Sequence, residues 1–586
     1  MYQDNIQRVQ KTLDKLHTKK NFLSICRIIL LLTSVYLFYL MVYQKNETMG
    51  LWAFLVLILF VFTVNRYLNL LTQLKYYKAL KNINEEELAF LEGKHQFENG
   101  VAFLNPQHAF SYDLDLFGKG SIFEFINRTG TSLGKQRLAF DLQEIPDETT
   151  IKLKQEAVKE LSNNLSFRQQ FQTLARLANT TEQEDAAIKK WAETISDVPR
   201  KSIRIAAVLV PLLFFFSLIA TIFDLHPLAI RLTTLFFTIN LMLSGMMMKF
   251  ISPEIGKSDK ISHSLQQYSQ MIQLFESESF QSEELKRMQK SLEVNNKMAT
   301  QIVRQLATLF EKLNTVANLF VFILFNGTFQ YHFWVHKKLI KWKNDNQQYL
   351  WQWIEVIGKV ESLNSIANFA YNNPEYQYAN VTSKDLIFAD LGHPLIDKRK
   401  RIRNDIDFTK QSFFILTGSN MSGKSTFLRA VGINLVLSYV GAPIDVTKAS
   451  VCPLPIWVSM RLTDSLSESE SYFFAEVKRL KEIVTQASKE PVFVLLDEIL
   501  KGTNSDDKKS GTVGVIKKLH EFGVKGIIAT HDLEVCEISK NYPEVMANKR
   551  FEVEIINDEL HFDYRLKDGI CQNKNATFIM KKMNII

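Results

Sequence analysis

The chain has 586 residues, which is enough for several domains, and with 46% hydrophobic and 23% charged residues its composition is that of a folded protein. The net charge of +8 is mild, so it is compatible with nucleic acid or an anionic membrane surface as a partner but requires neither. The four cysteines (Cys26, Cys452, Cys536 and Cys571) are widely spaced without a CxxC pair, which argues against a zinc site or a disulfide framework and suits a reducing compartment.

Two pairs of long apolar runs occur in the first half of the chain. The first pair is Phe22–Tyr43 and Met49–Val64, and the second is Ile205–Phe223 and Leu228–Met248. A helix needs about 20 apolar residues to cross a bilayer, so each run fits or nearly fits one span. Basic residues flank both pairs, whereas the connecting turns carry one Lys between them. By the positive-inside rule this predicts a multi-pass protein of the inner (cytoplasmic) membrane, with four spans and cytoplasmic termini; buried core helices are the alternative.

The pattern of the remaining sequence changes near residue 385. Before that point apolar residues recur at helical spacing, and after it short apolar runs alternate with helical patterns, as in an α/β domain. The expected units are an N-terminal transmembrane hairpin with a cytoplasmic helical linker (1–116, the linker being 65–116), a first part of a helical core (117–202), a second transmembrane hairpin (203–250), a second, lever-like part of the core (251–384) and an α/β domain (385–586).

Two shorter segments are ambiguous. The run Leu319–Phe325 is apolar, but it is too short to span a bilayer, so we expect a buried helix end. Five of the six residues in Lys398–Arg403 are basic. This cluster could contact nucleic acid or lipid headgroups, although a solvated loop before a strand is the favoured interpretation.

The segment Gly418–Ser425 is the most informative of the chain. It follows a strand-like apolar run, Phe413–Thr417, and precedes a helical stretch. A strand, a Gly-rich loop and a helix that starts with Lys and Ser are typical of a P-loop, whose backbone N–H groups and helix N-terminus hold phosphates. We therefore expect ATP to be bound by Gly418, Ser419, Asn420, Met421, Ser422, Gly423, Lys424, Ser425 and Thr426. Within this set, Lys424 would reach the β- and γ-phosphates and Ser425 would bind Mg²⁺.

Two strand ends follow this loop in the order that an ABC-type ATPase requires. Val492–Glu498 is an apolar strand ending in two carboxylates, a Walker B pattern. Asp497 would hold Mg²⁺, and Glu498 would polarise the attacking water. Ile527–His531 is a strand that ends in a histidine, and His531 could donate a hydrogen bond to the γ-phosphate.

A serine-rich segment lies between the P-loop and the Walker B strand. Ser469 and Ser471 precede a helix that is expected to begin near Tyr472. Hydroxyl and N–H groups at a helix start can bind phosphate, and in ABC-type ATPases this segment closes on ATP held by the partner subunit. We expect Ser471 to bind ATP in this way, although serine-rich helix starts are also common in purely structural roles.

Together these motifs resemble those of the MutS family. The P-loop, including its Asn-Met pair, and the stretch Asp497–Ser505 are similar to the P-loop and the Walker B region of that family. Ala529–His531 is similar to its terminal histidine motif, and Gly392–Pro394 to the element that opens its ATPase domain. Gly120–Phe123 is similar to the start of its helical core. The resemblance is strong over 385–586 and looser over 117–384, and it does not extend to the residues before 117.

The resemblance implies an ATP hydrolase that uses ATP and Mg²⁺ and works as a homodimer with composite ATP sites. It implies that Ser471 of one subunit completes the ATP site of the other. Lys424 would neutralise phosphate charge, and His531 would sense the γ-phosphate. The expected fold is therefore multidomain: α-helical membrane hairpins, an α-helical core and lever, and an α/β P-loop ATPase domain of the ABC type.

The sequence also departs from that family. The N-terminal mismatch-reading domain is missing, a membrane hairpin stands in its place, and Ser469 occupies a position where the family usually has Gly. We therefore expect an ATPase that acts on DNA near the membrane, through backbone contacts and without strong mismatch reading. An ABC-like membrane machine or a nucleotide-gated scaffold, acting on a protein or lipid partner, is the alternative.

Overall fold

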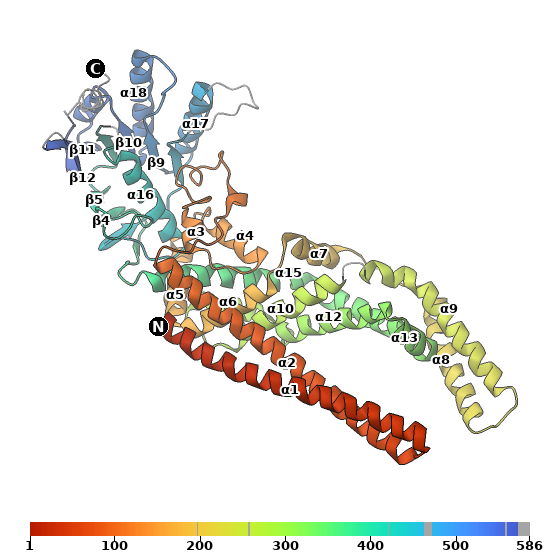
Figure 1. Cartoon of the computed structure of the whole chain (residues 1–586). Helices are drawn as coiled ribbons and strands as arrows, with labels where there is room; N and C mark the ends of the chain where they lie inside the picture. The colour runs from red at the N-terminus through yellow and green to blue at the C-terminus, as the bar shows by residue number, and fades with distance from the viewer. Residues whose placement is uncertain (196, 256–257, 420, 462–471, 557–558, 572–586) are drawn as a thin grey trace.

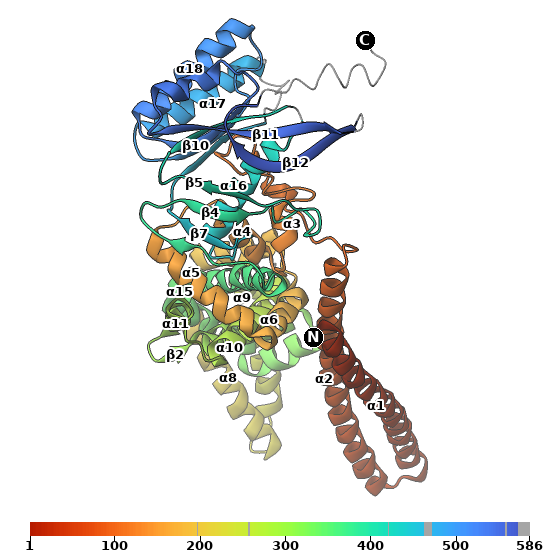
Figure 2. The same cartoon turned by 90° about the vertical axis from the view of Figure 1, so that its left-hand side faces the viewer.

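The computed structural model describes residues 1–195, 197–255, 258–419, 421–461, 472–556 and 559–571. An α/β region at one end and two long helical hairpins at the other are joined by a helical core (Figure 1). Both hairpins project in the same direction, away from the sheets, and a second view shows the same arrangement (Figure 2).

The first hairpin consists of α1 (Tyr2–Gln44) and α2 (Glu47–Leu91). Near its base the two helices bury apolar side chains against each other, among them Leu13 and Leu74, whereas its outer part exposes its apolar residues to the surroundings. Because α2 ends at Leu91, the second half of the predicted helical linker 65–116 is not a long helix. Residues 92–121 instead form turns and one short 3₁₀ segment.

The base of this hairpin is tied to the core by a buried polar network. Glu87 is 1% exposed and forms an ion pair with Arg128. Its carboxylate also accepts hydrogen bonds from Asn368 at 3.0 Å and Asn372 at 3.1 Å. A buried ion pair is tolerated only when such further hydrogen bonds satisfy it, so the network fixes where the hairpin leaves the core.

The second hairpin consists of α8 (Lys201–Ile222) and α9 (Ala229–Ile255). Within the described residues, four helices are long and apolar enough to cross a membrane: α1, α2, α8 and all but the last residue of α9. A fifth crossing results only if a pair of helices bent by 93°, 299–317 and 319–329, is counted as one span.

That bent pair forms an elbow, residues 318–330, between α12 (Ala299–Asn314) and α15 (Tyr331–Asn372). It contains α13 (Leu319–Val321), a π-helical turn (Phe322–Asn326) and α14 (Gly327–Phe329). The prediction of a buried helix end for Leu319–Phe325 is wrong, because Leu319 is 71% and Phe320 73% exposed.

The elbow rests on α9 through backbone and polar contacts. Asn240 donates a hydrogen bond to the carbonyl oxygen of Gly327 at 3.0 Å, and Gln330 donates one to the carbonyl oxygen of Asn240 at 2.6 Å. A Cβ atom at Gly327 would lie 2.3 Å from the ring of Phe237, so only glycine allows this approach. These contacts hold the elbow against the second hairpin and leave its apolar side chains facing outward.

The predicted helical core is confirmed as helical. Its helices are α3 (Ile122–Ile126), α4 (Ser132–Asp141), α5 (Glu148–Asn163), α6 (Leu165–Ala178), α7 (Glu182–Glu193), α10 (Ser258–Ser277), α11 (Glu283–Ser291) and α12, with a small hairpin of β1 (Glu293–Val294) and β2 (Lys297–Met298). The long helix α15 runs through this core to the α/β region (Figure 1). Its buried Glu361 accepts hydrogen bonds from the backbone N–H groups of Gly130 and Thr131, at 2.6 and 3.2 Å. These hydrogen bonds fix α15 to the segment that leads into α4.

The C-terminal region is α/β, as predicted. A six-stranded sheet has the order β12-β11-β6-β10-β9-β8, and it is parallel except for the β11–β12 pair. Its strands are β6 (Phe413–Thr417), β8 (Ile456–Ser459), β9 (Phe493–Asp497), β10 (Lys525–Thr530), β11 (Met546–Ile556) and β12 (Glu559–Asp568). A smaller sheet has the order β3-β7-β4-β5, formed by β3 (Asn380–Val381), β7 (Lys448–Val451), β4 (Ile387–Leu391) and β5 (Asn404–Asp407).

Helices cover both faces of the larger sheet. Alternate residues of β6 point to opposite faces: Phe413 and Ile415 join the core under α17 (Tyr472–Ala487) and α18 (Ser505–Glu521), while Phe414 and Leu416 join the core under α16 (Lys424–Tyr439). Because both faces of β6 are covered, its sequence is apolar at successive positions and does not alternate between apolar and polar residues.

The segment before the helical core packs on the α/β region. Asp113 is 3% exposed, and its carboxylate accepts the backbone N–H groups of Met460 at 2.9 Å and Arg461 at 2.6 Å. Arg479 of α17 donates to the carbonyl oxygens of His108 and Ala109. The non-helical part of the linker therefore joins the first hairpin to the α/β region.

Candidate active site

The predicted phosphate-binding loop lies between β6 and α16. Gly423 has a φ of 102° immediately before α16, a backbone conformation that glycine adopts without strain. Ser422 is 1% exposed, and its hydroxyl has no hydrogen-bond partner within the described structure. Asn420 lies outside the described residues. Strand, loop and helix follow one another as the sequence predicts, and an unsatisfied buried hydroxyl at this place fits a site that takes a polar ligand.

Lys424 begins α16 and is buried inside the loop. Its Nζ donates hydrogen bonds to the carbonyl oxygens of Gly418 at 2.7 Å and Ser419 at 3.2 Å, and it lies 3.7 Å from Oε1 of Glu498. Burial lowers the pKa of Lys424, and the carboxylates of Glu498 and Asp497 oppose this shift. A desolvated cation aimed at the loop is suited to hold an anion.

Ser425 at the start of α16 contacts Asp497 at the carboxyl end of β9. The hydroxyl of Ser425 donates a hydrogen bond to Oδ2 of Asp497, the last residue of β9. A hydroxyl and a carboxylate oxygen are ligands that Mg²⁺ accepts, and Mg²⁺ sites in nucleotide-binding proteins use one or two such protein groups with phosphate and water. The pair therefore fits the predicted metal position. Within the described residues, three or more His, Cys, Asp or Glu side chains do not gather into a metal-binding group.

The register of the parallel strands brings the other two predicted residues to the same edge. Ala529 of β10 lies opposite both Leu416 of β6 and Asp497 of β9. Glu498 is the first residue after β9 and His531 is the first residue after β10. Nδ1 of His531 lies 3.6 Å from Oε1 of Glu498. The carboxyl ends of three parallel strands therefore gather a cation, a hydroxyl, two carboxylates and an imidazole around one loop.

The loop after Glu498 is held by a residue that the sequence analysis assigned no role. Glu476 on α17 is 2% exposed, and its carboxylate accepts the N–H groups of Leu500 at 2.6 Å and Lys501 at 3.0 Å. Burial raises the pKa of Glu476, and these two hydrogen bonds oppose the shift. Ser471, predicted to reach ATP of a partner subunit, lies outside the described residues.

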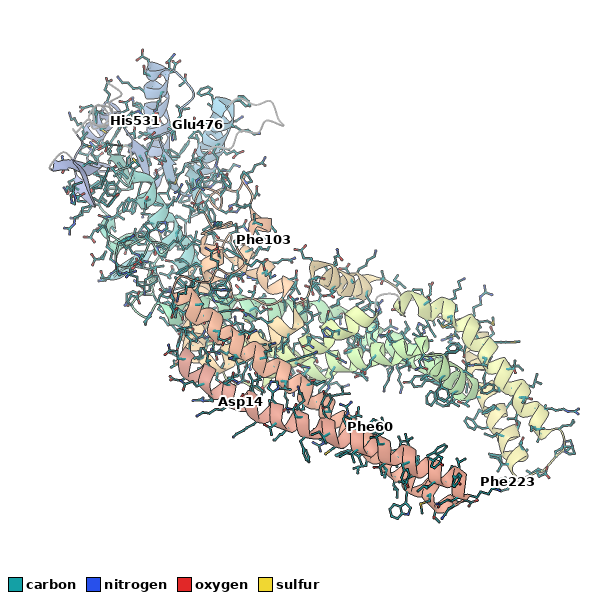
Figure 3. The ribbon with its side chains drawn as sticks, viewed as in Figure 1. Asp14, Phe60, Phe103, Phe223, Glu476 and His531 are labelled. Atoms are coloured by element: carbon teal, nitrogen blue, oxygen red, sulfur yellow. The ribbon has the colours of Figure 1, made fainter. Side chains whose placement is uncertain are left out.

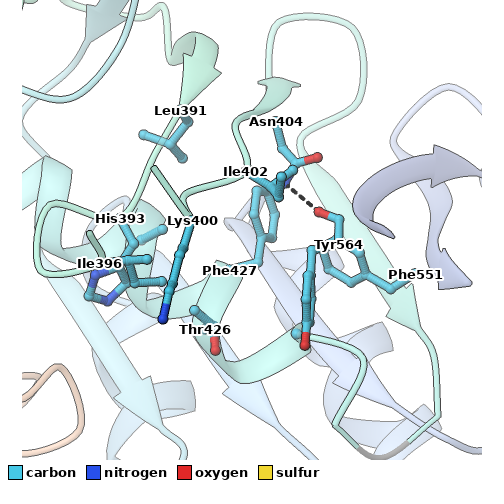
Figure 4. A pocket seen from close by; sticks show the side chains of 12 residues that line it. Leu391, His393, Ile396, Lys400, Ile402, Asn404, Thr426, Phe427, Phe551 and Tyr564 are labelled. Carbon is cyan, nitrogen blue, oxygen red and sulfur yellow. Dashed lines mark hydrogen bonds between the residues drawn. The ribbon is translucent and has the colours of Figure 1, made fainter. Parts of the chain in front are cut away.

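A pocket of about 300 Å³ opens beside the phosphate loop (Figure 4). Its lining includes Gly423, Thr426 and Phe427 at the start of α16, together with His393, Ile396, Lys400, Asn404, Phe551 and Tyr564. The Tyr564 ring lies against Gly423, where a Cβ atom would be 3.0 Å from it, and the Tyr564 carbonyl oxygen accepts a hydrogen bond from Asn404 at 3.0 Å. A mostly apolar pocket next to the predicted phosphate-binding loop is suited to a nucleoside.

The sequence analysis did not predict most of the residues that line this pocket. Of its lining residues outside the loop, only His393 belonged to a motif, and Tyr564 comes from β12, which carries no nucleotide-binding motif. No local signal could have identified them, because β4, β5, β11, β12 and the loop between β4 and β5 supply most of them from separate parts of the chain.

The basic cluster Lys398–Arg403 is paired within the chain. Arg401 has a side chain only 4% exposed and binds Asp445, to which Arg403 also pairs. Lys398 pairs with Glu375, and Arg399 with Asp397. The favoured interpretation, a solvated loop before a strand, is confirmed, because residues 398–400, 402 and 403 are exposed and β5 follows at Asn404. Four of the five cations pair with carboxylates, and the fifth, Lys400, lines the pocket.

The comparisons with known proteins concern the same part of the chain. Residues 414–585 match the family model MutS domain V. The DNA mismatch repair protein MutS of Thermotoga neapolitana is 30% identical over 225 residues, which are 37% of this chain and 28% of that protein. The protein of the same name from Aquifex pyrophilus is 30% identical over 220 residues, 36% of this chain and 25% of that protein.

A human relative is similar to the same extent. MutS protein homolog 4 of Homo sapiens is 28% identical over 228 residues, covering 37% of this chain and 24% of that protein. The matched region thus spans less than a third of the length of each of these relatives.

Proposed function

The C-terminal part of this chain belongs to the MutS family, and from that premise we propose that the protein is a membrane-anchored, MutS-like ATPase. The proposal rests on one observation above all: Lys424, Ser425, Asp497 and Glu498 converge at one edge of the sheet around the phosphate loop. Each of these groups has a defined task in ATP hydrolysis, and the pocket beside the loop is suited to the base and ribose.

The chemistry follows from the contacts of these side chains. Lys424 exchanges its present carbonyl partners for phosphate oxygens and neutralises their charge. Ser425 and Asp497 hold Mg²⁺, which supplies further charge neutralisation when bound. Glu498 orients and polarises the attacking water. His531 donates a hydrogen bond to the γ-phosphate, a role supported by the 3.6 Å between its Nδ1 and Oε1 of Glu498.

ATP turnover and ATP binding measured separately test these roles. Glu498→Gln keeps the shape of the side chain but removes the carboxylate, so turnover should fall roughly 10²-fold or more while ATP still binds. Lys424→Ala should weaken binding itself. Glu490→Gln, an exposed carboxylate away from the site, is the matched control and should leave turnover unchanged. Wild-type turnover in Glu498→Gln removes this residue from the proposed mechanism.

Membrane anchoring is the second part of the proposal. It is supported by the four long apolar helices, by their exposed apolar side chains and by the common direction of the two hairpins. Phe60 and Phe223 lie on the hairpins, far from Glu476 and His531 at the other end of the molecule (Figure 3).

Topology can be tested with reporter fusions. Reporters placed after Asn46 and after Asp224 should be found on the side opposite to the ATPase. A cytoplasmic reporter at either turn contradicts the four-span topology, and release of the protein from membranes by an alkaline wash contradicts anchoring altogether.

A homodimer with shared ATP sites is the third part. It is motivated by the family of the C-terminal region and by the position of Ser471 before α17. If Ser471 of one subunit completes the site of its partner, mixing Lys424→Ala with Ser471→Arg subunits should restore part of the activity, since some dimers then hold one intact site. No recovery in a mixture shown to form heterodimers would favour a site built within one chain.

The substrate on which the ATPase acts has two candidates. DNA is supported by the mismatch repair relatives, and weak binding that falls steeply with salt, without mismatch preference, is the expected result. A protein or lipid partner is favoured by one observation: the cations of Lys398–Arg403 that were candidates for DNA contact are mostly paired with carboxylates. Binding to paired and mispaired duplexes at several salt concentrations decides between them. Tenfold mismatch preference restores a repair-type sensor, and no binding at low salt favours the second candidate.

A further inference from the structure

A groove of about 460 Å³ lies between the start of α8 and the start of α15. Three cationic side chains line it: Lys201 and Arg204 from α8, and Lys337 from α15. Four apolar side chains line the rest: Ile205, Val208, Leu209 and Phe333. The helical spacing explains the arrangement, because residues three, four, seven and eight positions apart on α8 share one face and Phe333 and Lys337 are one turn apart on α15.

The three cations have no acidic partner within the described part of the chain. All three side chains are exposed, and no described carboxylate forms an ion pair with any of them. Lys337 lies 5.0 Å from the ring centre of its neighbour Trp334. This differs from Lys398–Arg403, where nearly every cation has a carboxylate partner. Three convergent, unpaired cations favour an anionic ligand.

The surroundings of the groove indicate which anion. From Ile205 onward α8 is apolar and most of its large side chains are exposed, including Leu209 at 52% and Phe216 at 72%. The elbow brings further exposed apolar side chains to the start of α15, such as Leu324 at 41%. Trp334 lies at the boundary of this apolar surface, and the Lys and Arg side chains lie just outside it. This is the pattern found at the interface between lipid tails and headgroups. The cations therefore lie at the level of the headgroups.

We propose that this groove binds one anionic phospholipid. Its phosphate is held by Lys201, Arg204 and Lys337, and one acyl chain lies along Ile205, Leu209 and Phe333. A lipid with a net negative headgroup, such as phosphatidylglycerol, is preferred over zwitterionic phosphatidylcholine, because the groove offers cations without a carboxylate to pair the choline. The proposal rests on the proposed membrane anchoring of the second hairpin.

The test uses the purified full-length chain in detergent, titrated with phosphatidylglycerol or with phosphatidylcholine of the same acyl chains, with bound lipid counted by native mass spectrometry. The wild type should bind phosphatidylglycerol more tightly. Lys201→Gln/Arg204→Gln/Lys337→Gln should weaken phosphatidylglycerol binding at least about tenfold, that is about 1.4 kcal/mol. It should weaken phosphatidylcholine binding less, because the choline already neutralises the phosphate of that lipid.

A matched control separates a built site from general charge. Lys312→Gln/Lys338→Gln/Lys341→Gln removes the same charge from exposed lysines near the elbow that do not line the groove. This control should bind phosphatidylglycerol like the wild type, and an equal loss in both triple variants overturns the proposal. Leu209→Ser, at an exposed apolar position, should weaken phospholipid binding. Inorganic phosphate at the same concentration as the phospholipid should not displace it from the wild type. Displacement by phosphate would assign the groove to a free anion instead.

Two readouts keep the possible failures apart. ATP turnover of each variant shows whether it is folded, and if the triple variant is inactive, Lys337→Glu alone takes its place. An alkaline wash of wild-type membranes tests anchoring. If the wild type is released, both anchoring and the lipid site fail. If it stays in the membrane but binds both lipids equally, only the lipid site fails.

Discussion

The hydrogen bonds of Glu476 should control the position of the loop that carries Glu498, the proposed catalytic carboxylate. Glu498 and Leu500 have φ angles of 51° and 61°, a left-handed conformation that costs a residue other than glycine about 1 kcal/mol or more. The Glu476 carboxylate stabilises this turn by accepting the N–H groups of Leu500 and Lys501. Glu476→Gln keeps one acceptor oxygen and turns an amide NH₂ toward the other N–H group.

The expected cost follows from that geometry. A buried N–H group left without an acceptor costs about 1–3 kcal/mol, so the loop that carries Glu498 should leave its active position, and turnover should fall roughly 5- to 150-fold. ATP binding should change much less, because Lys424 and the phosphate loop do not contact Glu476.

Steady-state ATP hydrolysis and equilibrium binding of a non-hydrolysable ATP analogue measure the two effects separately. Glu482→Gln, on the same helix but with a side chain 48% exposed, is the matched control and should lose less than about twofold. Wild-type turnover in Glu476→Gln, or an equal loss in both variants, would refute the reasoning.

Three further changes have defined outcomes. Tyr564→Ala removes the ring beside the phosphate loop and should raise the KM for ATP about 5- to 150-fold with little change in kcat, on the scale of base–aromatic stacking; an unchanged KM would mean that the base lies elsewhere. Burial raises the pKa of Asp185 to about 6, so the folded chain binds a proton that the unfolded chain has lost, and the free energy of unfolding should fall by roughly 3 kcal/mol as pH rises from about 4 to 6. Asp185→Asn should abolish this part of the fall, which thermal unfolding in detergent across that pH range would measure. Asp113→Ala leaves the N–H groups of Met460 and Arg461 without their acceptor. At about 1–3 kcal/mol for each group, the free energy of unfolding should fall by about 2–6 kcal/mol, as denaturation of the detergent-solubilised chain would detect.

The sequence alone predicted the groups of the proposed ATP site that lie within short motifs. Gly418–Thr426, Asp497–Glu498 and His531 each follow directly on an apolar strand, and a strand fixes where the next few residues lie. Parallel strands with both faces covered also have a distinctive apolar signal, so the α/β region could be recognised. The four long apolar runs were equally visible, because their length and lack of charge are local properties.

The tertiary structure decided whatever depends on partners that are distant in the chain. Arg401 and Arg403 could not be matched to Asp445 from the sequence. The run Leu319–Phe325 was predicted to be buried, whereas the elbow contacts α9 through Gly327 and leaves this run exposed. Glu476 and Tyr564 gained their places in the same way, from α17 and β12. The physical reason is common to all: charge pairing, burial and pocket shape arise between side chains that folding brings together, and no pattern along the chain encodes which carboxylate a given arginine will meet.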